Sequence, residues 1–263
     1  MRVLSVDWDY FFPNVAWYDW GHQETEFFIQ MSWHLRCGNH NMKTGERAIE
    51  AVNPDKKLLT NFWEKRLSNI PNALFIAESH ASIYHWLHDF HIDELVNFDQ
   101  HHDLGYPSAK GYLECGNWAG KMLNEKRIKQ YTLVYPPWRN RKKEIEEDTP
   151  KRKNVFIEHD HRQIAKSEYD AVFICRSGAW TPSWCDDDFH RFVSFFVGTS
   201  IWDDVRISSY NPMTKRSPNR KDALILADDY ERNLSNLGLP KRIQEQDQGE
   251  KKTKKQRRNS RKK

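Results

Sequence analysis

The segment from Asp99 to Asp103 places two carboxylates and two imidazoles directly after an apolar run. The sequence "LVNFDQHHDLGY" at 95–106 begins like a buried strand and continues into this polar group. In an extended backbone alternate side chains share one side, so Asp99, His101 and Asp103 would face together while His102 points elsewhere. Carboxylate and imidazole donors without a thiolate are typical of a hard or borderline divalent metal.

Two other apolar runs end in side chains of the same kind. The run at 2–8 leads into Asp7 and Asp9, and the run at 72–78 leads into His80. Residues that follow parallel strands converge at one edge of a sheet, even when they are far apart in sequence. Four aspartates at one place would repel one another unless cations were present, and two divalent ions balance their charge. The sequence therefore predicts a two-metal site with the ligands Asp7, Asp9, His80, Asp99, His101 and Asp103.

This donor set favours two Mn²⁺ ions, with Fe²⁺, Co²⁺ or Zn²⁺ as alternatives. A pair of such ions lowers the pKa of a water molecule, so hydrolysis is the chemistry implied. An Asp-x-Asp pair or a single histidine is more often a cap or a turn, and the prediction depends on the agreement of the three segments. The segment "HLRCGNH" contains a separate set of possible zinc ligands, His34, Cys37 and His40, but no fourth ligand follows at a fixed spacing.

Short apolar runs alternate with amphipathic stretches along the chain, which predicts an α/β fold with a mostly parallel sheet flanked by helices. The predicted strands are 2–8, 72–78, 94–99, 130–136, 154–159 and 170–177. The predicted helices are 79–91, 116–127 and 185–197. Residues 14–60 have no clear period and are interpreted as a helical or looped insertion near the site.

The charge is distributed unevenly. Residues 241–263 carry 11 Lys and Arg against 3 Asp and Glu, which leaves 30 basic and 34 acidic side chains in residues 1–240. The tail has almost no apolar residues and is predicted to be disordered, as a solubility tail or as a weak binder of polyanions. We expect one domain over residues 1–240, followed by this tail.

The four cysteines are far apart and form no Cys-x-x-Cys pair, which argues against a zinc ribbon and a disulfide framework. The chain begins in a strand without a signal peptide, and no apolar stretch approaches the length of a membrane helix. We therefore expect a cytoplasmic protein that does not bind membranes.

The three motifs resemble those of the ureohydrolase (arginase-like) superfamily. Its members carry Gly-Gly-Asp-His, Asp-Ala-His-x-Asp and Ser-x-Asp-x-Asp segments, and the counterparts here are "AESH" at 77–80, "DQHHD" at 99–103 and "SVDWD" at 5–9. The resemblance implies a three-layer fold and two manganese ions on the six residues named above, with Asp99 and either Asp7 or Asp9 bridging.

The order of the motifs differs from that of arginases, because the Asp-x-Asp strand comes first here and late there. A permuted strand order keeps the sheet if each strand keeps its place in space. The arrangement resembles a poorly characterised branch that includes peptide arginases, which convert arginine side chains to ornithine within a peptide.

Two further departures concern the chemistry. "ECGNWAG" at 114–120 resembles an arginase stretch whose histidine shuttles protons, yet Ala119 stands at that position. Arginases place a guanidinium-binding glutamate on the last strand, where "FICRSGAW" at 173–180 offers Arg176 and Ser177. Glu78, Glu114 or Asp186 would then have to bind the guanidinium.

Further site residues are predicted around the ligands. The candidates for proton transfer are His102, Glu158 and His159. The candidates for substrate binding are Glu78, Asn117, Arg176, Ser177 and Trp180. Pro182 and Trp184 would line the pocket mouth or equally belong to the core.

The leading interpretation is a binuclear metallohydrolase that cleaves a C–N bond in a guanidino or amidino group of a small compound or an arginine-containing peptide. One alternative is a deacetylase-like amidohydrolase with a single zinc ion. Another is a catalytically silent metal-binding protein whose basic tail holds a polyanion, and a two-metal phosphoesterase is also compatible with clustered carboxylates.

Overall fold

The computed structural model describes residues 1–13, 24–37, 47–105, 111–139, 149–208, 211–213 and 218–236. The basic tail at 241–263 and His40 lie outside these residues. Within them the chain forms a sheet of seven strands in the order β5-β4-β3-β1-β6-β2-β7, and every neighbouring pair is parallel. The strands are β1 Arg2–Asp7, β2 Ala73–Ala77, β3 Ile92–Phe98, β4 Ile128–Val134, β5 Val155–Glu158, β6 Ala171–Cys175 and β7 Arg206–Ile207.

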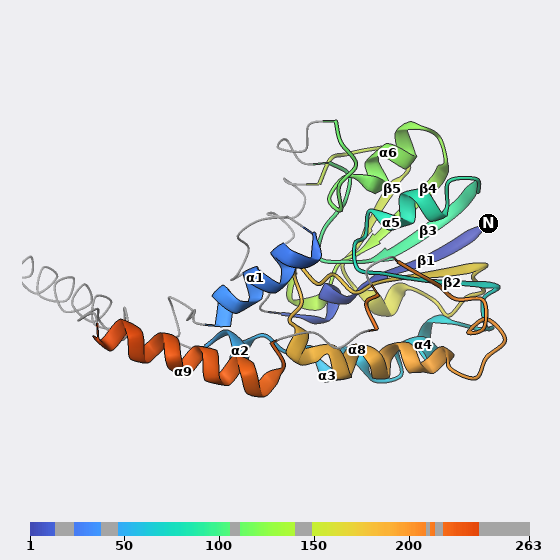
Figure 1. Cartoon of the computed structure of the whole chain (residues 1–263). Coiled ribbons are helices and arrows are strands. Elements are labelled where there is room, and N and C mark those ends of the chain that lie inside the picture. Colours follow the sequence, from blue (N-terminus) through green and yellow to red (C-terminus); the bar gives the residue numbers. More distant parts are fainter. Residues whose placement is uncertain are drawn as a thin grey trace, which may run out of the picture.

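The sheet is the middle layer of three, because successive strand side chains enter two separate apolar clusters. In β1, Leu4 and Val6 belong to one cluster and Val3 to the other. The first cluster is covered by α1 Glu26–Cys37, α2 Ala48–Ala51, α3 Lys56–Leu59, α4 Phe62–Arg66, α8 Asp186–Val193 and α9 Arg220–Asn236. The second is covered by α5 Ser82–Trp86 and α6 Trp118–Asn124, which lie on the opposite side of the sheet in Figure 1.

The six predicted strands are confirmed to within two residues at each end, because each contains an apolar run, and β1, β2 and β6 are buried along almost their whole length. The sheet is wholly parallel rather than mostly parallel, and β7 was not predicted. The three predicted helices are present but shorter. The prediction of helix 79–91 was too long, because α5 ends at Trp86 and turns carry the chain through exposed residues into β3.

The described parts of 14–60 are helical and contribute to the core. Ile29 and Trp33 of α1 and Ile49 of α2 are buried against the first cluster. The Trp33 indole donates a hydrogen bond to the carbonyl of Gly178 at 2.6 Å, which ties α1 to the segment after β6. None of the described helices is both long and apolar enough to cross a membrane.

The order of the strands determines which segments meet at the carboxyl edge. β1 pairs directly with β3 and with β6, whereas β2 reaches β1 only across β6. The turns after β1, β2 and β3 therefore gather around the end of the most central strand. This is the edge at which an open parallel sheet binds its ligands.

Gly120 lets α6 approach the turn after β3. A Cβ at this position would lie 2.3 Å from the carbonyl oxygen of Leu104, and the Gly120 N–H donates to the carbonyl of Asp103 at 3.0 Å. We expect Gly120→Ala to lower the free energy of unfolding by about 3 kcal/mol, because backbone has to move.

Gly111→Ala is the comparison for that variant. Gly111 has φ +81°, and nothing lies within 4 Å of the position that an added methyl group would take, so only backbone strain of about 1 kcal/mol is expected. Urea unfolding of both variants measures the difference, and equal losses would contradict the close approach of α6.

Candidate metal centre

The end of β1 turns so that two carboxylates face the same region. Asp7 is the last residue of the strand, and its Oδ1 accepts the Asp9 N–H at 3.0 Å as the chain enters a 3₁₀ turn. The Gln100 amide donates to the carbonyls of Asp9 at 2.5 Å and Phe12 at 2.7 Å and so holds this turn. Asp9 therefore does not continue the extended backbone of β1, and a side-chain cap brings Asp7 and Asp9 together.

The end of β3 has a similar turn. Asp99 follows the strand, and its Oδ1 accepts the His101 N–H at 2.7 Å. Asp103 has φ +53°, so its backbone is left-handed and not extended as expected. The Asn97 amide donates to Asp99 Oδ2 at 3.0 Å and the Trp118 indole to Asp103 Oδ2 at 2.5 Å. These outer partners fix both carboxylates in place.

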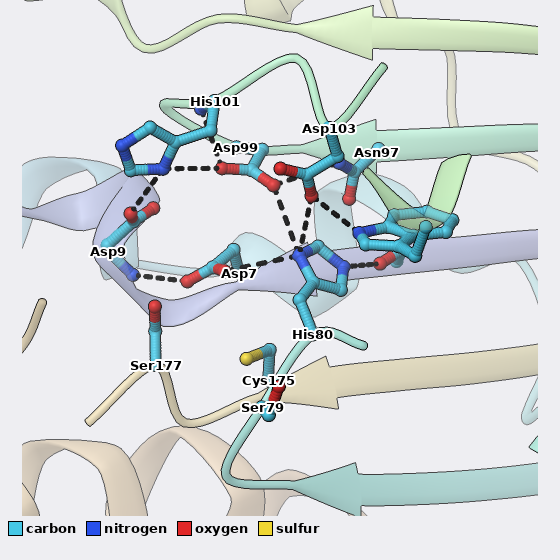
Figure 2. Close-up of polar contacts among 12 residues, drawn as sticks. Asp7, Asp9, Ser79, His80, Asn97, Asp99, His101, Asp103, Cys175 and Ser177 are labelled. Atoms are coloured by element: carbon cyan, nitrogen blue, oxygen red, sulfur yellow. Dashed lines mark hydrogen bonds and ion pairs between the residues drawn. The ribbon is translucent and has the colours of Figure 1, made fainter. Parts of the chain in front are cut away.

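His80 stands at the centre of the carboxylates. Its Nδ1 lies 3.2 Å from Asp7 Oδ2, 3.1 Å from Asp99 Oδ2 and 3.2 Å from Asp103 Oδ2 (Figure 2). Its Nε2 lies 2.7 Å from the hydroxyl of Ser5 in β1. If the Ser5 hydroxyl accepts a hydrogen bond from Nε2–H, Nδ1 carries a lone pair that faces three carboxylate oxygens. This arrangement is favourable only with a cation between them.

His101 forms the second half of the cluster. Its Nδ1 lies 3.0 Å from Asp9 Oδ2 and 3.5 Å from Asp99 Oδ1. Asp99 therefore presents one oxygen toward His80 and the other toward His101 (Figure 2). The His101 side chain is 25% exposed, and its ring lies 4.9 Å from that of Trp180.

The pKa values show how the protein carries this charge when no metal is bound. Burial would lower the pKa of His80, but Asp103, Asp7 and Asp99 outweigh it and raise that pKa well above the usual value. Burial and the charge of Asp99 raise the pKa of Asp103 to about 7. For Asp99 burial is outweighed by His101 and His80, which hold its pKa well below the usual range. Protons on the imidazoles thus offset the charge of the carboxylates.

Several buried polar atoms of the cluster make no hydrogen bond of good geometry. Within the described part of the chain these include both oxygens of Asp9 and Nδ1 of His80, whose close neighbours are the imidazole and carboxylate groups named above. Burying such atoms is costly unless they are paired or coordinate a metal. Three sets of donor atoms lie close enough to hold an ion: His80, Asp99 and Asp103; Asp9, Asp99 and His101; and Asp7, His80 and Cys175. The buried histidines and aspartates are thus positioned to bind metal ions.

Cys175 is a residue that the sequence did not single out. It ends β6, and its thiol donates to the carbonyl of Glu78 at 3.4 Å. Burial, with the charge of Asp7 beside it, raises the pKa of this thiol well above its usual value. The aspartates and histidines are therefore the better ligands. No spacing in the sequence relates Cys175 to Asp7, because pairing between β1 and β6 alone brings them together.

The predicted proton-transfer residues have different surroundings. His102 is buried, and its Nδ1 accepts the Leu104 N–H at 3.0 Å, so its ring supports the turn after Asp99. Glu158 accepts the Asp160 N–H at 2.7 Å, and His159 stacks on Tyr135. Within the described residues no hydrogen bond or ion pair joins Glu158 or His159 to the six predicted ligands. Ala119 is buried in the second apolar cluster.

Arg176 lies directly after β6, fully buried, and points toward the following segment. Its guanidinium donates to the carbonyls of Thr181 at 3.2 Å and Pro182 at 3.1 Å, to the Thr181 hydroxyl and, through two nitrogens, to Asp186. These five hydrogen bonds equal the number of N–H groups in a guanidinium. Arg176 therefore holds the 176–186 segment together, and Asp186 is engaged in the same contact.

The other predicted substrate residues have varied surroundings. Asn117 is bonded to the Glu114 N–H at 2.9 Å and the Tyr112 carbonyl at 2.6 Å, which closes the turn before α6. Ser177 has a left-handed backbone and is drawn beside the Asp7 to Asp9 turn in Figure 2. Glu78 is buried directly after β2, and Trp180 lies beside His101.

The remaining sequence candidates belong to the scaffold. The indole of Trp184 donates to the carbonyl of Val52 at 3.2 Å and packs on Trp33, and Pro182 caps a 3₁₀ turn. In α1, Cys37 is buried while His34 is exposed, so the two do not converge on a zinc site.

The pKa shifts predict how stability depends on pH without metal. An unfolded aspartate releases its proton near 3.8, whereas Asp103 keeps it until about 7, so stability falls as pH rises between these values. The raised pKa values of His80 and His101 stabilise the fold below about 6.5, and this contribution is lost as pH rises further. Asp99 loses its contribution only in strong acid.

We expect thermal unfolding in EDTA to shift to lower temperature between pH 5.5 and 8. With Mn²⁺ the trend should reverse, because the ligands must release protons to bind a metal and affinity therefore rises with pH. Melting curves in both buffers test this, and parallel trends would mean that the cluster binds no metal.

The fold and the site together define an α/β protein that carries buried His and Asp groups at the carboxyl edge of a parallel sheet. Comparison with known proteins adds no relative: no protein-family model, no curated protein and no solved structure matches the chain.

Proposed function

We propose that the chain is a binuclear metal-dependent hydrolase of a C–N bond in a guanidino or amidino group, with arginine in a peptide or protein as the favoured substrate. The observation that carries the proposal is Asp99, whose two carboxylate oxygens face two different histidines. A carboxylate with this placement suits a bridge between two ions better than a single zinc site. The resemblance to the permuted arginase-like branch supports the substrate and the choice of Mn²⁺.

Two groups of ligands would hold the ions. His80, Asp7 and Asp103 would hold one, His101 and Asp9 the other, and Asp99 would serve both. When bound, such ions lower the pKa of a water molecule and polarise the group that it attacks. Four aspartates and two divalent cations sum to no net charge, which removes the repulsion within the cluster.

The outer contacts prepare these ligands for their task. The Ser5 hydroxyl would accept a hydrogen bond from the Nε2–H group of His80 and so keep the Nδ1 lone pair available. Asn97 and Trp118 orient the carboxylates of Asp99 and Asp103. In other metal sites, loss of a residue that hydrogen-bonds to a metal ligand usually reduces metal affinity or activity about 10- to 100-fold.

The experiment that tests the proposal measures metal content and product together. Purified protein dialysed against Mn²⁺ should hold two ions per chain and release ornithine-containing peptide and urea from an arginine peptide. One zinc ion per chain, with deacetylation of an acyl-lysine peptide, would instead favour the single-zinc amidohydrolase. Protein that binds no metal would contradict both.

A further inference from the structure

Glu24 brings a carboxylate to the rim of the metal-ligand cluster from a distant part of the sequence. It lies just before α1, and its Oε2 accepts a hydrogen bond from the Ser79 hydroxyl. The Cys115 thiol is a second hydrogen-bonding neighbour. Ser79 is adjacent to His80, so Glu24 lies next to the cluster without belonging to any of the three sets of metal donors.

The charge around Glu24 is negative beyond what two ions can neutralise. Asp7 and Glu78 are close enough to oppose its ionisation. Burial comes first among the causes that raise the pKa of Glu24 to about 7. The four aspartate ligands already balance two divalent cations, so Glu24 remains as a surplus acid on this side. A site with this surplus attracts a cationic group.

The Glu24 side chain is also partly exposed, in contrast to the aspartates of the cluster. Glu24, Ser79 and Cys115 are each partly exposed, whereas Asp9 and Asp99 are fully buried. Solvent therefore reaches part of the Glu24 side chain, whereas it does not reach Asp9 or Asp99. No other carboxylate in the described residues is both partly exposed and hydrogen-bonded to the residue next to His80.

We propose that Glu24 is the substrate-binding residue that pairs with the guanidinium of an arginine side chain and holds it over the metal ligands. This inference rests on the proposed function. A guanidinium offers planar pairs of N–H groups that match a carboxylate, and such pairs are strong and directional. Ser79 is a positioning residue, because its hydroxyl fixes one oxygen of Glu24.

The test compares a cationic probe with a neutral one of the same shape. The Mn²⁺-loaded full chain is titrated with N-acetyl-arginine amide and N-acetyl-citrulline amide by calorimetry, and metal content is measured on the same samples. Wild type should bind the arginine probe at least about tenfold more tightly, as expected for a charge-assisted pair. Glu24→Gln should abolish this preference while the metal content stays unchanged.

Glu26→Gln is the matched control, since Glu26 is exposed and only two residues away. It removes the same charge and should keep the preference. If Glu24→Gln folds poorly, Ser79→Ala provides the second variant, because it removes only the hydroxyl and should weaken the preference severalfold. A purely structural Glu24 would alter stability and not the discrimination between the two probes.

The outcomes separate this inference from the proposed function. A wild type that holds two ions but does not prefer the arginine probe overturns the role of Glu24. A Glu24→Gln variant that keeps the preference does the same. A wild type without metal contradicts the proposed function, whatever the probes do.

Discussion

Asp99→Asn is expected to remove both metal ions and to lower hydrolysis by more than about 100-fold, which exceeds the loss from removing an outer partner of a ligand. The amide keeps the size of the side chain but loses the charge that faces both His80 and His101. The remaining groups no longer balance two divalent cations. Metal analysis after dialysis and urea release from an arginine peptide measure the effect.

Asp89→Asn is the control for that substitution. Asp89 is exposed and bonded only to His88 within the described contacts, so its loss should change neither metal content nor rate. An Asp99→Asn variant that still holds two ions would show that the two histidines do not share this carboxylate.

Asp186→Asn is expected to destabilise the fold by about 3–5 kcal/mol, the usual cost of leaving one member of a buried ion pair without its partner. Asp186 accepts hydrogen bonds from two nitrogens of the Arg176 guanidinium, and both residues are almost fully buried. The melting temperature should fall by roughly 10 °C, since each kcal/mol corresponds to a few degrees in a chain of this size.

The control is Asp187→Asn, which makes the same change one residue away at an exposed position of α8. It should cost less than about 1 kcal/mol, the value of a charge near a helix N-terminus. Similar melting temperatures for the two variants would mean that Arg176 does not depend on Asp186.

The strands could be predicted because their apolar runs have no other explanation in a chain of this length. β1 and β6 are buried on both faces; β6 contains no charged residue, and before Asp7 the only polar residues of β1 are Arg2 and Ser5. The helix α9 was not predicted, since its apolar residues form one continuous run at 223–227, in which only Ala223 and Ala227 are buried. Periodicity does not detect such a helix.

The convergence of the candidate ligand side chains could also be predicted, though for a partly wrong reason. The sequence indicated that Asp99, His101 and Asp103 belong together, but a turn and a left-handed residue produce the convergence, and an extended strand does not. Glu24 was missed because it lies in the segment 14–60, where the apolar residues follow no clear helical or strand period. Only the folded chain places it beside Ser79.

The position of β6 between β1 and β2 has a consequence for how the protein matures. Asp7 and Asp99 can meet once β1 and β3 have paired, but His80 follows β2, which joins the sheet only through β6 and β7. A nascent chain must therefore be synthesised beyond residue 175 before this histidine has its place. Loading of the ions is thus expected to follow translation of most of the chain rather than to guide its first steps.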